Sequence, residues 1–273
     1  MPNFILIDGS YFIFYRYYAI VQWYKCSKQE PLIGDVKDII NNEKFMEKFL
    51  KTFNSKIKEI SEKLKIENPI MIVGKDCPRK EIWRNKHYSK YKENRVYDDT
   101  FLGGPIFKKV YDDDLFIKSG VEKIFSCPEL EADDCIAITT KHILEKYPES
   151  NIYIITSDMD YLQLSKPNVH LYNLKYKKLT DSKNCFNDPK KDLACKIIMG
   201  DKSDNIEPIM KKCGIKTASK LYDEPILLLR KLANDEKIKE KFFLNAKIID
   251  FGQIPDDLVK KFKEKNIYIN KWD

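Results

Sequence analysis

The chain has 273 residues, of which 43% are hydrophobic and 33% charged, so it can form one large or two modest domains with buried cores. It has no apolar run of about 18 residues, the length that crosses a membrane, and it starts with strand-like sequence instead of a signal or transit peptide. We therefore expect an intracellular protein, in a compartment or virion left open, and the net charge of +7 favours a polyanionic partner.

Four short apolar runs predict strands that end at polar loops: Phe4–Ile7, Ile70–Val73, Ile152–Ile155 and the shorter His170–Tyr172. Between them, apolar residues at helical spacing predict helices at Asn42–Leu64 and Ala132–Tyr147. Continuous apolar strands that alternate with helices indicate a parallel sheet with helices on both faces.

Carboxylates follow the ends of three predicted strands, and others begin the helix at Ala132. These acids are Asp8, Asp76, Glu131, Asp133, Asp134, Asp158 and Asp160. One acid in a first helical turn is usually a cap that accepts a free N–H group. Seven acids at one edge of a parallel sheet, the edge where such proteins bind ligands, are hard to explain as caps alone and favour a functional site. The seven cysteines are dispersed without a CxxC pair and the three histidines are far apart, so we expect reduced thiols and no zinc site.

Two basic regions follow a different pattern from the sheet. The segment from Lys75 to Asp114 mixes lysine and arginine with tyrosine and tryptophan, which suits a single-stranded nucleic acid or, equally well, a solvated basic surface. After Asn184 a predicted helix at Lys190–Met199 is followed by a loop and by GIKTASKL at 214–221. Two helices joined by such a glycine-containing hairpin can present N–H groups and lysine to a phosphate.

Five motifs match, in order, those of the 5′-nuclease superfamily: LIDGS at 6–10, YKENR at 91–95, ELEADD at 129–134, TSDMD at 156–160 and GDKSDNI at 200–206. The sequence thus resembles flap endonucleases, phage 5′-exonucleases and the 5′-nuclease domain of bacterial DNA polymerase I. The resemblance implies an α/β fold with a PIN-like parallel sheet and helices on both faces. It also implies a nuclease domain at 1–183 with a helical arch at about 77–120, and a helix-hairpin-helix DNA-binding domain at 184–273.

The resemblance also assigns roles to individual residues. The metal-site carboxylates are Asp8, Asp76, Glu131, Asp133, Asp134, Asp158, Asp160, Asp201 and Asp204. Lys92 and Arg95 are catalytic, and the DNA-binding residues are Arg84, Tyr91, Lys211, Lys212, Gly214 and Lys216. An oxygen-only ligand set implies two Mg²⁺ ions, which Mn²⁺ can replace. The hairpin sequence PIMKKCG at 208–214 has a single glycine where relatives have several, which puts in question the K⁺ ion that they bind there.

The implied activity is that of a structure-specific 5′–3′ exonuclease and flap endonuclease, which hydrolyses DNA phosphodiester bonds by a two-metal-ion mechanism. Its expected substrates are 5′ flaps, nicked or branched duplex and 5′ ends, cleaved by a monomer; the sequence has no convincing sliding-clamp peptide. The alternatives are a PIN-like ribonuclease, RNase H-type activity on RNA–DNA hybrids, and a non-catalytic DNA-binding protein. The region after Asn184 argues against a short PIN domain, and retention of the repulsive acids argues against lost catalysis. The sequence leaves open the preferred substrate, and whether the pathway is replication, repair or recombination.

Overall fold

The computed structural model describes residues 1–27, 38–95 and 101–268. In these ranges, five parallel strands form one sheet in the order β3-β2-β1-β4-β5. The strands are β1 (Phe4–Asp8), β2 (Ile70–Gly74), β3 (Lys123–Phe125), β4 (Ile152–Ile155) and β5 (Val169–Tyr172). The four predicted strands are confirmed, while the short edge strand β3 was not predicted. The α/β fold class predicted from the sequence is therefore confirmed.

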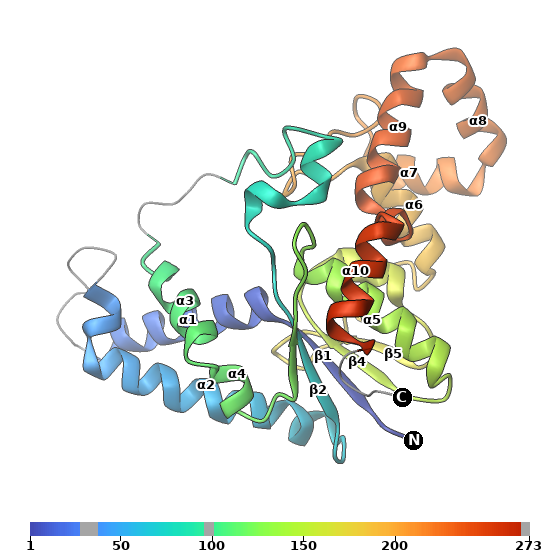
Figure 1. Cartoon of the computed structure of the whole chain (residues 1–273). Helices are drawn as coiled ribbons and strands as arrows, with labels where there is room; N and C mark the ends of the chain where they lie inside the picture. The colour runs from blue at the N-terminus through green and yellow to red at the C-terminus, as the bar shows by residue number, and fades with distance from the viewer. Residues whose placement is uncertain (28–37, 96–100, 269–273) are drawn as a thin grey trace.

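Helices cover both faces of the sheet (Figure 1). One face carries α1 (Gly9–Cys26), α2 (Glu43–Leu64), α3 (Gly104–Asp112) and α4 (Leu115–Lys118), and the other carries α5 (Ala132–Lys146) and α10 (Asp256–Asn266). Alternate residues of β1 point into the two cores, with Ile5 and Ile7 on one side and Phe4 and Leu6 on the other. The helices predicted at 42–64 and 132–147 are confirmed to within a residue at each end. The sequence reading did not predict α1, because aromatic residues surround that helix and hide its apolar stripe.

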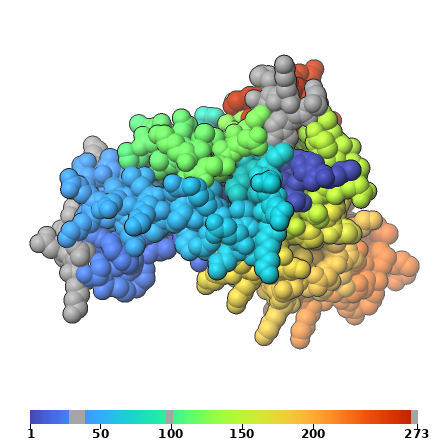
Figure 2. Space-filling view, turned by 90° about the horizontal axis from the view of Figure 1, so that it is seen from below, coloured from blue at the N-terminus to red at the C-terminus, as the bar shows by residue number. Residues whose placement is uncertain are grey.

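A second group of helices stands beyond the carboxyl ends of the strands. It consists of α6 (Pro189–Met199), α7 (Ile215–Asp223), α8 (Pro225–Asn234) and α9 (Glu236–Ile249). Seen from below, α2 in blue and the green α3–α4 region form one end of the molecule, and the orange helices form the opposite end (Figure 2). The predicted domain boundary near 184 stays a prediction, and α10 is an exception to it because Leu258 and Phe262 pack in the core of the sheet.

Short 3₁₀ helices complete the described chain: η1 (Asp38–Asn41), η2 (Arg79–Glu81), η3 (Trp83–Lys86), η4 (Met159–Leu164), η5 (Leu179–Asp181) and η6 (Phe251–Gln253). The predicted arch at 77–120 includes η2, η3, α3 and α4, while residues 96–100 lie outside the described residues. Its first part, residues 88–95, is hydrogen-bonded to the loop that follows α6. The N–H of Lys92 donates to the carbonyl of Asp204 at 2.9 Å, and the Tyr88 hydroxyl donates to the carbonyl of Asn205 at 3.0 Å. This clasp between residues 88–95 and 202–205 fixes the base of the arch over the sheet edge. No helix in the described ranges is long and apolar enough to cross a membrane.

Candidate metal centre

The carboxyl ends of β1, β2 and β4 surround a hollow of about 220 Å³, here called the acidic hollow. Its acids are Asp8, Asp76, Glu131, Asp133 and Asp158. Lys92 and Arg95, from the base of the arch, line the same hollow. The predicted convergence of acids at this edge is therefore present, next to the central strand β1, where the order of the strands changes direction.

Several of these acids cap a helix and face the hollow at once. Asp8 is the N-cap of α1 and accepts the N–H of Tyr11 at 2.9 Å. Asp158 caps η4 through the N–H of Asp160, at 2.9 Å. Asp76 accepts the N–H of Ala132, the first residue of α5, at 2.8 Å. Capping and ligand binding are thus not exclusive here, because a helix that starts at the sheet edge carries its capping carboxylate to that edge.

A glycine lets the strand ends approach one another at the hollow. A Cβ atom on Gly9 would lie 2.7 Å from the carbonyl oxygen of Gly74, closer than real Cβ atoms come to backbone. Any side chain at position 9 would therefore push the start of α1 away from the end of β2, and with it the carboxylate of Asp8.

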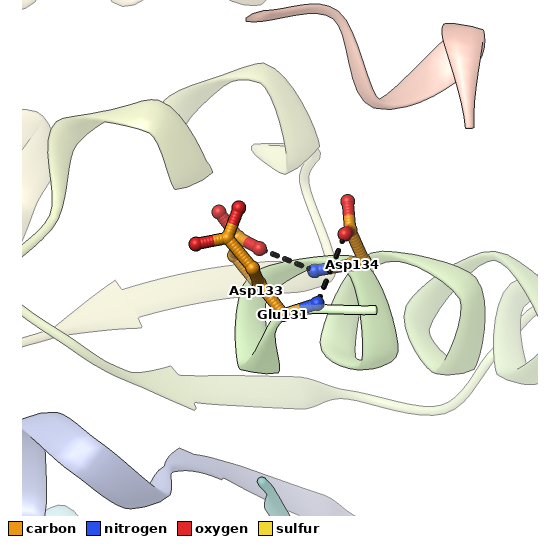
Figure 3. A group of neighbouring side chains, drawn as sticks. All are labelled: Glu131, Asp133 and Asp134. Carbon is orange, nitrogen blue, oxygen red and sulfur yellow. Dashed lines mark hydrogen bonds between the residues drawn. The ribbon is translucent and has the colours of Figure 1, made fainter. Parts of the chain in front are cut away.

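The first acidic group consists of Glu131, Asp133 and Asp134, whose carboxylate oxygens lie within 4.8 Å of one another. Glu131 and Asp133 point the same way, whereas Asp134 turns to another side of the helix start (Figure 3). Asp134 is fully buried and accepts four N–H donors, from Trp83 Nε1 at 3.0 Å, from Arg84 Nη1 and Nη2 at 2.8 and 2.7 Å, and from the backbone of Glu131 at 3.1 Å. Both of its oxygens are thus engaged inside the protein. Asp134 therefore anchors Arg84, and its role as a metal ligand stays a prediction.

Arg84 and Tyr91, which are predicted to bind DNA, are buried among the acids. Arg84 is 1% exposed, pairs with Glu131 at 3.0 Å as well as with Asp134, and donates from Nε to the carbonyl of Ile248 at 2.7 Å. The hydroxyl of Tyr91 is also buried and donates to Glu131 at 3.0 Å. Both side chains therefore support the acids from within the protein, and their contact with DNA stays a prediction.

The second acidic group consists of Asp160, Asp201 and Asp204, again with oxygens within 4.8 Å of one another. Asp160 follows β4, and the other two lie in the loop after α6, which an Asp201–Ile206 bridge closes. Gly200, at φ 67°, starts this loop in the left-handed region, and a Cβ there would meet the carbonyl of Ile206 at 2.4 Å. The Nζ atom of Lys196 lies 2.5 Å from Asp160 Oδ1 and 2.6 Å from Asp201 Oδ2.

Two cations from the predicted arch, Lys92 and Arg95, lie between the two acidic groups, and their catalytic role stays a prediction. The ammonium group of Lys92 contacts Glu131 and lies 3.7 Å from Asp204 Oδ2. Arg95 donates to the other oxygen of Asp204 at 2.5 Å. Tyr91 also joins the groups, since its hydroxyl is 3.0 Å from Glu131 and 3.2 Å from Asp204.

The electrostatics of the site favour a bound cation. Burial, with Asp76 adding to it, raises the pKa of Asp8 to about 7, and burial with Asp158 does the same for the pKa of Asp160. The pKa of Asp133 is raised well above its ordinary value by burial and by Asp134. Burial alone would raise the pKa of Glu131, but Lys92 and Arg84 bring it below the usual range. Crowded carboxylates of this kind hold protons until another positive charge neutralises them.

The donor set fits hard divalent cations, because every ligand candidate in the two groups is a carboxylate oxygen. Sequence reasoning missed three supporting residues. Ser10 donates to Asp76, Trp83 donates to Asp134, and Lys196 joins Asp160 to Asp201. Lys196 had a signal in the sequence, since it lies in the last turn of the predicted helix at 190–199, which leads directly to Asp201.

The hairpin residues predicted to bind DNA do not line the acidic hollow. Lys211, Lys212, Gly214 and Lys216 are exposed on the loop before α7 and on its first turn. Lys212 adopts φ 55°, a left-handed conformation that glycine reaches without strain. The hairpin thus contains a lysine in a conformation that is typical of glycine, and the DNA contact of Lys212 stays a prediction.

Comparisons with known proteins identify a family and related chains. Residues 3–190 match the family model described as "5′-3′ exonuclease, N-terminal resolvase-like domain". The chain is 28% identical over 295 aligned residues to a 5′-3′ exonuclease of Mycoplasmopsis pulmonis, covering 98% of this chain and 87% of the relative. It is 29% identical over 273 residues to a 5′-3′ exonuclease of Buchnera aphidicola subsp. Baizongia pistaciae, covering 98% and 76%.

Two solved structures have the same fold. One is the bacteriophage T5 5′-exonuclease with bound zinc, with a TM-score of 0.66 at 18% identity over 96% of this chain and 97% of that chain. The other is a bacteriophage T5 flap endonuclease variant in a pseudo-enzyme-product complex with DNA and metal ions, with a TM-score of 0.66 at 17% identity over the same shares.

Proposed function

The chain belongs to the 5′-3′ exonuclease family with an N-terminal resolvase-like domain, and we propose that this nuclease hydrolyses DNA both from 5′ ends and at the base of 5′ flaps. The observation that supports this most directly is the position of Lys92, between the two acidic groups and on the wall of the acidic hollow. A scissile phosphate in the hollow would lie between the carboxylates at the sheet edge and the cations at the base of the arch.

We propose that the cofactor is Mg²⁺, with two ions and with Mn²⁺ as a substitute, because all the candidate ligands are hard carboxylate oxygens. The metal-bound T5 structures support a divalent cation in this fold. Glu131 and Asp133 would hold one ion with the other acids of the hollow, and Asp160, Asp201 and Asp204 would hold the second. Bound ions of this kind lower the pKa of a coordinated water and neutralise charge on the leaving oxygen.

The chain's own cations have a separate task. Lys92 and Arg95 are held against Glu131 and Asp204, so they are already directed at the place where negative charge develops. Such preorganised donors stabilise the transition state without reorganisation at the moment of reaction. Arg84 and Asp134, buried beneath them, keep Glu131 in place. The T5 complex with DNA supports a DNA substrate, and the exposed lysines of the hairpin would bind duplex phosphates at a distance from the acids.

The test is digestion of 5′-labelled flap, nicked, blunt-ended and RNA–DNA hybrid substrates with Mg²⁺, followed by measurement of product lengths. We expect release from the 5′ side and cleavage at the base of the flap, with no product in excess EDTA. Asp133→Asn is the inactive control, since its carboxylate faces the hollow. Full cleavage with chelator, or products that shorten from the 3′ end, would overturn the proposal. Preference for the hybrid would favour the RNase H-type alternative.

A further inference from the structure

We propose that Lys196 acts as a built-in cation of the second acidic group, whose ammonium holds Asp160 and Asp201 together until a divalent ion displaces it. The second ion would therefore bind more weakly than the first, and only as the lysine leaves. This inference rests on the proposed metal-dependent function and concerns a residue outside the ligand set.

The first step is the geometry around the ammonium. Its nitrogen lies 2.5 Å from Asp160 Oδ1 and 2.6 Å from Asp201 Oδ2, and the Lys196 side chain is largely buried. Mg²⁺ binds oxygen at about 2.0–2.1 Å, so an ion that used the same two oxygens would lie at most about 4 Å from the nitrogen. Like charges at that distance repel strongly in a buried site. Lysine and metal therefore compete for one position.

A second step concerns the place to which the lysine can move. Lys196 and Asp160 border a cavity of about 380 Å³ between α6 and η4, which shares no lining residue with the acidic hollow. Asp192 borders the same cavity and lies one helical turn before Lys196, at the i,i−4 spacing that allows an ion pair on a helix. Its Oδ2 accepts only the Cys185 thiol, at 3.5 Å, among the contacts of the described chain. The displaced ammonium would thus have both space and a carboxylate to receive it.

The first acidic group has a different arrangement. Lys92 contacts Glu131 of this group and does not bridge two of its acids in the described chain, while the guanidinium of Arg84 is fixed behind the acids by Asp134 and by the carbonyl of Ile248. Asp8, Asp76 and Asp133 face the acidic hollow directly. The two positions therefore differ in what an incoming ion must displace.

Removal of Lys196 should change the affinity for the second ion in opposite directions if the lysine competes with the metal and if it only positions the metal ligands. If Lys196 only positions Asp160 and Asp201 for the metal, its removal must weaken binding of the second ion. If it competes with the metal, its removal must tighten that binding. Cation affinity in the absence of DNA separates the two roles.

The experiment is a titration of the full chain with Mn²⁺, in which free Mn²⁺ is counted by electron paramagnetic resonance. Wild type should show one tight and one weak site, and Lys196→Gln should tighten the weak site at least tenfold. Lys191→Gln is the matched control, because Lys191 lies on the same helix but pairs with Asp223, at the surface. Asp192→Asn should weaken the second site in wild type and have no effect beside Lys196→Gln. Lys196→Arg keeps the positive charge and should therefore retain the weak Mn²⁺ site. This variant shows whether a change in affinity comes from the lost charge or from a disturbed fold.

The outcomes are separable. A second site that is unchanged or weaker in folded Lys196→Gln would overturn the displacement proposal and leave the nuclease function intact. Absence of any Mn²⁺ binding to wild type would overturn both.

Discussion

Replacement of Asp134 by asparagine distinguishes an anchoring acid from a metal ligand. The change keeps the size of the side chain but removes the charge that faces Arg84 and places an NH₂ group among four N–H donors. Breaking a buried ion pair in this way typically costs about 3–5 kcal/mol. Because Arg84 keeps Glu131 at 3.0 Å and the carbonyl of Ile248 at 2.7 Å, we expect the lower end, about 3 kcal/mol.

The assay is urea unfolding in EDTA, followed by circular dichroism, for Asp134→Asn and for Asp158→Asn. Asp158 caps η4 by accepting the N–H of Asp160, and the amide oxygen of asparagine can accept the same N–H. Its carboxylate also lines the acidic hollow together with four other acids. Asp158→Asn should therefore leave the free energy of unfolding unchanged or raised, while cleavage is lost. Trp83→Phe removes one donor to Asp134 and should cost about 1 kcal/mol. If Asp134→Asn keeps wild-type stability and loses only cleavage, the anchoring role is wrong and Asp134 is a metal ligand.

Three further predictions follow from the same site. The raised pKa values of Asp8 and Asp160, both about 7, mean that the native chain binds more protons than the unfolded chain between about pH 4 and pH 7. In EDTA the free energy of unfolding should thus fall as the pH rises through that window, and Mg²⁺ should make this fall smaller. Thermal unfolding measured across the window checks this expectation, and a free energy of unfolding that rises with pH would contradict it. Lys92→Ala should lower the single-turnover rate on a flap about a hundredfold or more with duplex affinity in Ca²⁺ nearly unchanged, whereas a loss in affinity alone would assign Lys92 to docking. Alanine at all three exposed hairpin lysines should weaken duplex binding, and each lost phosphate contact should reduce the slope of log binding constant against log salt concentration by about 0.9. The cleavage rate should be restored at saturating substrate. A slope equal to that of wild type would show that the duplex docks on another part of the protein.

The sequence predicted the sheet edge better than it predicted the directions of single side chains. Strands β1, β2 and β4 are almost entirely buried and β5 is buried at alternate residues, so their apolar runs are visible in the sequence. Strand β3 has only three residues, of which Phe125 alone is buried. The acids that follow strands were found for the same reason. Asp201 and Asp204 lie in a loop without periodicity, and only the motif match indicated them.

The direction of the side chain could have been inferred from the sequence for Asp133 and Asp134, but not for Arg84. Asp133 and Asp134 are successive residues of a helix and point about 100° apart, so both cannot face one hollow equally. The burial of Arg84 depends on the carbonyl of Ile248, which is 164 positions away along the chain. A contact at that separation leaves no local trace, and the resemblance alone therefore placed Arg84 at the DNA.

The return of α10 to the sheet has a consequence for synthesis of the chain. Leu258, Phe262 and Ile267 fill the face of the sheet that α5 only partly covers, and the ring of Phe262 packs edge-on against Phe125, with centroids 5.8 Å apart. Asn266 closes the contact with a hydrogen bond to the carbonyl of Ser126 at 3.2 Å. A ribosome that has made the whole nuclease site has not yet made this cover. The nascent sheet therefore keeps an apolar face exposed until residues 256–267 emerge, and docking of α10 is the step that completes the core on that face.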